Sequence, residues 1–231
     1  MPEAQTVQAK YIFLDIVGFT HERSIEAQSD IIGVLNRLVR EAVEAQDIDK
    51  ESVIYIPTGD GMCIALLNGT KPLGVHMQIA LNILSGVNKH NEKAPDKMRE
   101  FKTRIGINQN LDNKIVDING MSNVAGDGIS MAQRIMDKAD GGQILVGVSV
   151  HQELVGREEY MNQWRPFTTE VKHGRTIQVY QYVKKGIPGL NIGPPGALKG
   201  VSDTVKGMSD TVSDAFSGAA KVIQKPFTKQ G

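Results

Sequence analysis

Two aspartates, each at the end of a predicted strand, constrain the fold of this chain most strongly. The stretch YIFLDIVGFT (11–20) opens with four apolar or aromatic residues, which predict a short buried strand, and continues with Asp15 and the turn residue Gly18. The stretch VIYIPTGDGMCIALL (53–67) predicts a hairpin with Asp60 at its tip. A carboxylate at the end of a core strand is costly unless a cation meets it. We therefore expect the two strand ends to face each other across a cation site.

The chemistry of such a pair has two interpretations. Paired carboxylates suit hard divalent cations, which are commonly held by one or two carboxylates together with substrate phosphates, so that the cations clamp a triphosphate. In the alternative, Asp15 caps a helix and Asp60 fills a turn, which are common uses of aspartate at such places.

The amino-acid composition limits the class of protein to which this chain can belong. The 231 residues fit one domain and an extension, and the 26 basic residues equal the 26 acidic ones, so we expect no nucleic acid partner. The single cysteine, Cys63, lies in a predicted core strand, where it is expected to be a small buried hydrophobe. The N-terminus lacks a signal-peptide pattern, and no apolar run approaches the roughly 20 residues that span a bilayer. We expect a soluble, cytoplasmic protein.

The rest of the chain alternates between helical and strand patterns. The polar run QNLDN (109–113) is expected to be a turn, and His76 and His90 are expected to be surface histidines. The spacing predicts helices over 21–47, 73–89 and 148–154, and a further helix that begins at 127. It predicts strands over 103–108, 114–118, 143–146, 168–171 and 176–183. This order predicts an α+β fold of the ferredoxin-like kind, with helices packed on an antiparallel-centred sheet.

The C-terminal part has a different texture. Residues 185–200 are rich in proline and glycine and predict a linker. In the tail (201–231) apolar residues recur at steps of three and four, which predicts a short amphipathic helix that contacts a partner or a membrane surface. A frayed tail is the alternative, because two heptads are marginal alone.

Several ordered motifs together resemble one family. LDIVGFT followed by TGDGM resembles the signature of the class III nucleotide cyclases, the adenylate and guanylate cyclase catalytic domain. Further matches are TRIGIN (103–108), AGDGISMAQRIM (125–136), GGQILVGVSV (141–150) and VKHGRTIQVYQYV (171–183). The resemblance implies a class III cyclase homology domain over residues 1–184.

The resemblance also implies a metal site between two protomers. Class III cyclases pair head to tail, so a homodimer with active sites at its interface is expected. Asp15 and Asp60 match the metal-binding aspartates, and the backbone carbonyl of Ile16 matches a third ligand, for two Mn²⁺ or Mg²⁺ ions per site.

Other matches concern a nucleoside triphosphate. Arg104 matches a phosphate contact, Arg134 matches the partner-supplied arginine that stabilises the reacting phosphorus, and Lys172 matches the lysine on the terminal phosphate. Solvated charges are the alternative for Arg134 and Lys172. The turn that would cradle the β and γ phosphates consists of Gly18, Phe19 and Thr20.

The base-reading positions depart from the purine cyclases. Where those enzymes have Lys, or Glu for guanine, this chain has Ile56, and the partner-protomer residue that reads the amino group in those enzymes aligns with Asn123. Ser130 stands at the ribose-orienting Asn. Tyr55 is a candidate to contact a smaller ring, although strand alternation keeps Tyr55 and Ile56 on opposite faces unless Pro57 forces a bulge. Tyr55 as a packed strand aromatic is the alternative.

These departures resemble the bacterial pyrimidine cyclases of the Pycsar anti-phage defence. We therefore predict a pyrimidine cyclase that converts UTP or CTP to cUMP or cCMP and diphosphate, a second messenger for an effector that responds to cyclic nucleotides. The alternatives are an adenylate cyclase with an atypical base pocket and a non-catalytic cyclase-like module that binds a nucleotide or a partner.

Overall fold

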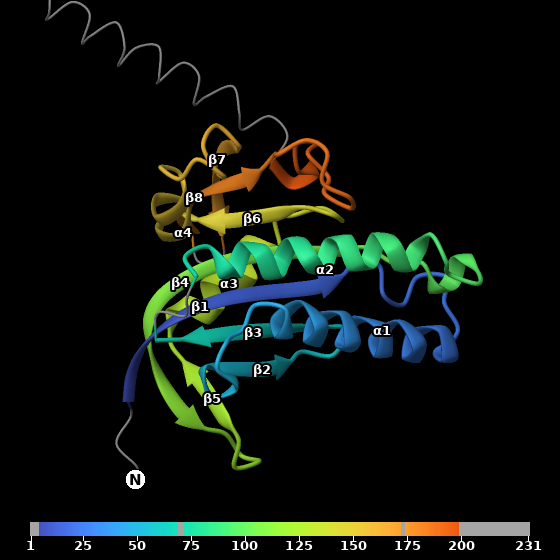
Figure 1. The fold of residues 1–231 in the computed structure, drawn as a ribbon, viewed down its shortest axis with the longest axis horizontal. Helices are drawn as coiled ribbons and strands as arrows, with labels where there is room; N and C mark the ends of the chain where they lie inside the picture. The colour runs from blue at the N-terminus through green and yellow to red at the C-terminus, as the bar shows by residue number, and fades with distance from the viewer. Residues whose placement is uncertain (1–4, 69–71, 172–173, 199–231) are drawn as a thin grey trace, which may run out of the picture.

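The computed structural model describes residues 5–68, 72–171 and 174–198 (Figure 1). In these residues, eight strands form one mixed sheet in the order β2-β3-β1-β4-β6-β8-β7, with β5 paired to β4. The strands are β1 (Gln5–Ile16), β2 (Val53–Pro57), β3 (Gly61–Leu67), β4 (Thr103–Val116), β5 (Ser122–Ala125), β6 (Ile144–Gly147), β7 (Trp164–Val171) and β8 (Arg175–Tyr182). The helices are α1 (Ile25–Glu44), α2 (Val75–Asn91), α3 (Asp127–Met136) and α4 (Val148–Leu154), with 3₁₀ turns η1 (Lys50–Ser52), η2 (Lys97–Arg99) and η4 (Gly196–Leu198).

The prediction of an antiparallel-centred α+β fold is confirmed. Strand β1 is antiparallel to both of its neighbours, β3 and β4, and the pair of β4 and β6 is parallel. Because β1 is central, it is buried on both faces: Tyr11 and Phe13 pack on one side, Ile12 and Leu14 on the other. Burying each such side chain contributes about 1.5–3 kcal/mol, which fixes the strand that ends at Asp15.

Helices cover both faces of the sheet. Helices α1 and α2 lie along one face, and α3 lies behind the sheet in the same view (Figure 1). Helix α1 begins after Ser24, whose side chain accepts a hydrogen bond from the Ala27 amide at 3.2 Å. Helix α3 approaches β4 closely, because a Cβ on Gly106 would lie 2.3 Å from the backbone nitrogen of Met136. Glycine at this position therefore sets the depth at which α3 packs.

The turn predicted at QNLDN is wrong. Strand β4 runs through this segment without a break, and its hairpin partner is β5, paired from Asn113↔Ala125 to Val116↔Ser122. The physical reason is that Asp112 is buried and hydrogen-bonded to Tyr11 and to the backbone of α3. Strand β1 is correspondingly longer than predicted, because its N-terminal half pairs with this part of β4.

His76 is also not the surface residue that the sequence predicted. Its side chain is fully buried on α2, and neither ring nitrogen has a hydrogen-bond partner in the described residues. Burial, together with the positive charge of Lys10, lowers the pKa of His76 to about 3, so the ring is neutral at ordinary pH. His90 is half-buried, and its Nε2 lies 3.0 Å from the Arg99 carbonyl oxygen.

The C-terminal part of the described chain packs against the domain. Within the predicted linker, the Gly193 carbonyl accepts hydrogen bonds from Gln143 at 2.8 Å and Gln181 at 2.7 Å, and Leu198 is fully buried. Lys172 and the predicted tail helix (201–231) lie outside the described residues. None of the helices in the described part of the chain is long and apolar enough to cross a membrane.

Candidate active site

The two predicted aspartates meet at one end of the central strand. Asp15 is the penultimate residue of β1 and lies opposite Gly61 on β3 and Arg104 on β4. The amide of Ile16 donates a hydrogen bond to the Asp60 carbonyl at 3.2 Å, which ties the hairpin tip to the end of β1. The geometry therefore brings Asp15 and Asp60 together from two strands, as the motifs predicted.

Glycines make this approach possible. A Cβ on Gly61 would lie 2.2 Å from the Leu14 carbonyl oxygen, so a side chain at this position would push the hairpin away from β1. Gly59 has a φ of +94°, a conformation that side-chain-bearing residues rarely adopt. The GDG triplet is thus required by the backbone on both sides of Asp60.

Arg104 forms an ion pair with Asp15. Its Nη2 and Nε donate to Oδ2 of Asp15 at 2.8 and 3.1 Å, and Nη2 also lies 3.8 Å from Asp137. Burial raises the pKa of Asp15 above its ordinary value; the hydrogen bond from Arg104 opposes that rise, and the charge of Asp60 adds to it. The carboxylates repel each other, and a cation would relieve that repulsion.

The donor set fits a hard divalent cation. The described residues contain no cluster of three or more His, Cys, Asp or Glu side chains. Mg²⁺ and Mn²⁺ do not need one, since they take oxygen ligands and commonly bind through one or two carboxylates and substrate phosphates. The carboxylates of Asp15 and Asp60 and the Ile16 carbonyl are the groups that would hold such ions.

Arg23 shapes the turn that follows β1, and sequence analysis missed it. It donates to the carbonyls of Gly18 and Phe19 and, at 2.9 Å each, to two backbone carbonyls of the 98–100 segment. In a planar trans peptide the N–H points opposite to the C=O, so the amides of Phe19 and Thr20 point away from Arg23. These amides are therefore available to an anion. The feature of the sequence that could have identified Arg23 is its place shortly after the predicted phosphate-binding turn at Gly18, Phe19 and Thr20.

Ser130 and Arg134 lie on α3, the helix on the face opposite α1 and α2. Ser130 is exposed and Arg134 is half-buried in the last turn of the helix. No hydrogen bond or ion pair joins Arg134 to Asp15, Asp60 or Arg104. Within one chain, therefore, the arginine predicted to act on the phosphorus does not contact the predicted metal site.

Within one chain, a cavity of about 640 Å³ brings Ile56 and Asn123 together, whereas the family resemblance assigns the Asn123 position to the partner protomer. It lies between β2 and the β4–β5 hairpin and is lined by Ile56 and Asn123 among others. The Oδ1 atom of Asn123 accepts a hydrogen bond from the Val124 amide at 2.7 Å. With its oxygen bonded to the Val124 amide, the NH₂ group of Asn123 is the part of this side chain left to donate to a ligand in the cavity.

Tyr55 borders the same cavity from the other face of β2. The pairing of β2 with β3 is continuous up to Pro57↔Met62, so Pro57 introduces no bulge. Ile56 packs with the core cluster on the α3 side, whereas burial and the charge of Glu44 on α1 raise the pKa of Tyr55. Tyr55 would reach a base only around the edge of β2.

A family model for the adenylate and guanylate cyclase catalytic domain matches residues 1–184. The chain belongs to this family. No curated protein matches the cyclase significantly.

Solved structures show the same fold. The guanylate cyclase domain of RhGC from Catenaria anguillulae, in complex with GTP, is 18% identical, with 77% of this chain and 96% of that chain covered and a TM-score of 0.59. The guanylyl cyclase Cya2 is 14% identical, with coverages of 82% and 99% and a TM-score of 0.66. The non-canonical dimeric guanylyl cyclase domain of the RhoGC fusion protein from the fungus Blastocladiella emersonii is 19% identical, with coverages of 79% and 97% and a TM-score of 0.54.

The cyclase domain exposes apolar side chains on the β4–β5 hairpin, which projects from the sheet in Figure 1. Ile118, at the hairpin tip, is fully exposed. The other large apolar residues exposed here are Leu111, Ile115, Val116 and Met121. Exposed apolar side chains that gather on one hairpin indicate an interaction surface.

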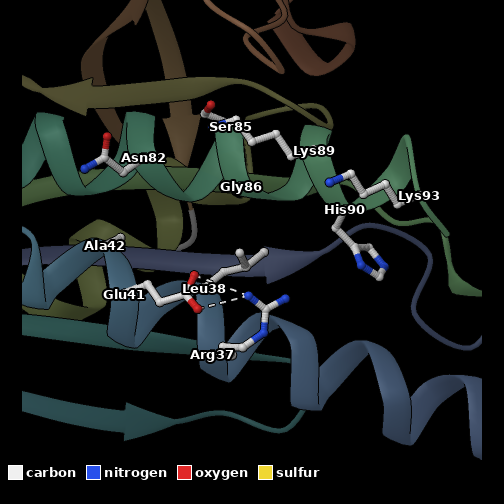
Figure 2. A pocket seen from close by; sticks show the side chains of 10 residues that line it. All are labelled: Arg37, Leu38, Glu41, Ala42, Asn82, Ser85, Gly86, Lys89, His90 and Lys93. Atoms are coloured by element: carbon white, nitrogen blue, oxygen red, sulfur yellow. Dashed lines mark hydrogen bonds and ion pairs between the residues drawn. The ribbon is translucent and has the colours of Figure 1, made fainter.

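A second cavity of this chain lies away from the residues predicted for the active site. It has a volume of about 480 Å³ and runs between α1 and α2, where Arg37 pairs with Glu41 at 3.0 Å (Figure 2). Lys89, His90 and Lys93 border it from the α2 side. None of the residues predicted for the active site lines this groove.

Proposed function

We propose that this cyclase converts UTP to 3′,5′-cyclic UMP and diphosphate, as a homodimer with Mn²⁺ or Mg²⁺. The observation that carries the choice of base is the orientation of the Asn123 amide. Its oxygen accepts from the Val124 amide, which leaves the NH₂ group as the donor that the side chain can offer to a base in the cavity.

A donor at this position selects among the four bases. The O4 atom of uracil accepts a hydrogen bond, whereas the exocyclic amino groups of cytosine and adenine are donors and would oppose the Asn123 NH₂. Guanine offers O6 as an acceptor, but beside a ring N–H that uracil also has, it carries a 2-amino donor that would meet Ile56, where a guanine cyclase supplies Glu. Uracil is therefore the base that fits best.

The chain's own residues supply the reaction geometry. Asp15, Asp60 and the Ile16 carbonyl would hold two ions, whose charge would activate the ribose 3′-hydroxyl and neutralise the triphosphate. In the reaction the 3′-oxygen attacks the α-phosphorus, the bond to the β-phosphate oxygen breaks, and diphosphate leaves.

Cationic and amide groups would stabilise the phosphates. The amides of Phe19 and Thr20, with Gly18 before them, would bind the β and γ phosphates, and Arg104 would move from Asp15 to a phosphate oxygen once cations are present. Arg134 of the partner protomer would stabilise the charge on the α-phosphorus, and Ser130 would orient the ribose. Lys172 stays a proposed contact of the terminal phosphate.

Two observations support the homodimer. The first is the apolar surface of the β4–β5 hairpin, and the second is the lack of contact between Arg134 and the Asp15 site within one chain. The similar domain from Blastocladiella emersonii is described as a non-canonical dimer, and its double mutant as monomeric. Active sites shared between two protomers would account for both features of this chain.

We further propose that the product is a second messenger in anti-phage defence that activates a cyclic-nucleotide-responsive effector. The altered base-reading positions, Ile56 and Asn123, support this role. Phage challenge of cells that carry the cyclase with its neighbouring effector, as wild type or as Asp60→Ala, tests it. Equal survival of both strains would contradict the role.

The substitution Asn123→Asp tests the choice of base. One carboxylate oxygen would still accept from Val124, and the other would face the cavity as an acceptor. We expect the variant to lose preference for UTP and gain preference for CTP, by about ten- to a hundred-fold in the ratio of kcat/KM, since a good base contact contributes about 1–3 kcal/mol. An unchanged preference would remove Asn123 from base recognition.

A further inference from the structure

One buried carboxylate, Asp112 on β4, joins three elements of the fold. It is 5% exposed, and its oxygens accept hydrogen bonds from the Tyr11 hydroxyl at 2.7 Å, the Asn110 amide at 2.7 Å and the backbone amide of Gly128 at 3.0 Å. Tyr11 lies on the central strand and Gly128 lies in the first turn of α3. The start of α3 is thus tied to β1 and β4 through a single side chain.

The contact between Asp112 and α3 leaves no spare room. A Cβ on Gly126 would lie 2.1 Å from Oδ1 of Asp112, and a Cβ on Gly128 would lie 2.5 Å from Oδ2. On the other side of the same residue, the Asn108 amide donates to the Gly128 carbonyl at 3.2 Å. Both backbone groups of Gly128 are therefore bound, so neither the position nor the rotation of the helix start is free.

The positions of the residues proposed for one half of the active site depend on this contact between Asp112 and Gly128. Ser130 and Arg134 lie within two turns of Gly128 on α3. Helix α3 has only 10 residues, so a shift at its first turn is carried to Arg134. A carboxylate at a helix N-terminus is also favourable for the helix dipole.

We propose that Asp112 is a positioning residue that sets Ser130 and Arg134 for the active site completed by the partner protomer. This inference rests on the proposed function, because it assumes that α3 acts on the nucleotide held by the other chain. Asp112 itself is too deeply buried to touch the substrate and acts through the backbone of α3.

The proposal predicts a specific pattern of defects. Asp112→Ala should lower kcat for the preferred nucleotide by about a hundred-fold, since a misplacement of about 1 Å can have an effect of this size. Stabilisation of the same variant by Mn²⁺, measured as a rise in Tm, should equal that of wild type, because Asp15 and Asp60 are untouched. Tyr11→Phe, which keeps the bond to Gly128, should lower kcat much less.

Mixed dimers assign the defect to one half of the site. Co-expressed with Asp60→Ala, Asp112→Ala should recover roughly a quarter of wild-type activity, because half of the dimers carry one intact site of two. Co-expressed with Arg134→Ala, it should recover nothing, since both changes damage the α3 half. Recovery with Arg134→Ala, or with neither partner, would overturn the proposal.

Controls separate positioning from general stability and from the proposed function. Arg165, on the edge strand β7, donates hydrogen bonds to Gln181 and to the Ile192 carbonyl. Arg165→Ala removes both bonds and should lower Tm without the loss of kcat. If Asp112→Ala does not fold, Asp112→Asn enters the same mixtures; failure of both variants to fold would mean a purely structural role and overturn the proposal. A mixture of Asp60→Ala and Arg134→Ala tests the shared site itself, and its failure would refute the dimer on which both proposals rest.

Discussion

Removing Arg104 should destabilise the metal-free protein and leave the metal-bound protein much less affected. The side chains of Arg104 and Asp15 are only 28% and 17% exposed and are joined at 2.8 Å. Breaking a fully buried ion pair costs about 3–5 kcal/mol, because the remaining charge is left without a partner. Partial exposure lowers this to about 2 kcal/mol for Arg104→Ala, which for a domain of this size means a Tm lower by about 4–8 °C.

The assay is thermal unfolding with excess chelator and again with saturating Mn²⁺. Since Mn²⁺ would take over the charge that Arg104 neutralises, the ion should raise the Tm of Arg104→Ala by more than that of wild type. Arg37→Ala is a matched control, because its exposed pair with Glu41 contributes at most about 0.5 kcal/mol. If Arg104→Ala unfolds at the wild-type temperature in chelator, the ion pair does not hold Asp15 as argued.

Two further predictions follow. Asp60→Ala and Arg134→Ala should each be inactive and, co-expressed, should recover roughly a quarter of wild-type activity; no recovery despite proven subunit exchange would mean that Arg134 does not act across the interface. Because the pKa of His76 is lowered to about 3, below the 6.5 of an unfolded chain, folding excludes a proton and stability falls as pH drops from 6.5, by about 1.4 kcal/mol per pH unit. In urea unfolding between pH 6.5 and 4.5, His76→Leu should remove this part of the pH dependence, and parallel curves for the two proteins would contradict it.

The sequence predicted the aspartate pair because local signals define it. Asp15 follows an apolar strand and Asp60 lies between two glycines, so both placements follow from residues within a few positions. The same holds for the hairpin of β2 and β3 and for helix α1, whose apolar spacing and Ser24 cap are readable along the chain.

The sequence misled where distant residues decide. The run QNLDN has the composition of a turn, yet it continues β4 because Asp112 finds partners on β1 and α3 that are about 101 and 16 residues away. Histidine is common at protein surfaces, yet His76 is fully buried on α2. Arg23 was passed over because its acceptors are backbone carbonyls, which carry no side-chain signature. In each case a polar group is satisfied, or buried, by contacts that no local pattern encodes.

The most direct test of the account is to offer the purified protein each of the four nucleoside triphosphates with Mn²⁺ and to resolve the cyclic products by chromatography and mass spectrometry. The donor that Asn123 presents beside Ile56 predicts cyclic UMP from UTP as the main product, with less from CTP and least from ATP and GTP. Conversion of ATP in preference to UTP would contradict the pyrimidine assignment and favour an adenylate cyclase. Absence of product from every nucleotide would contradict catalysis itself and favour a binding module.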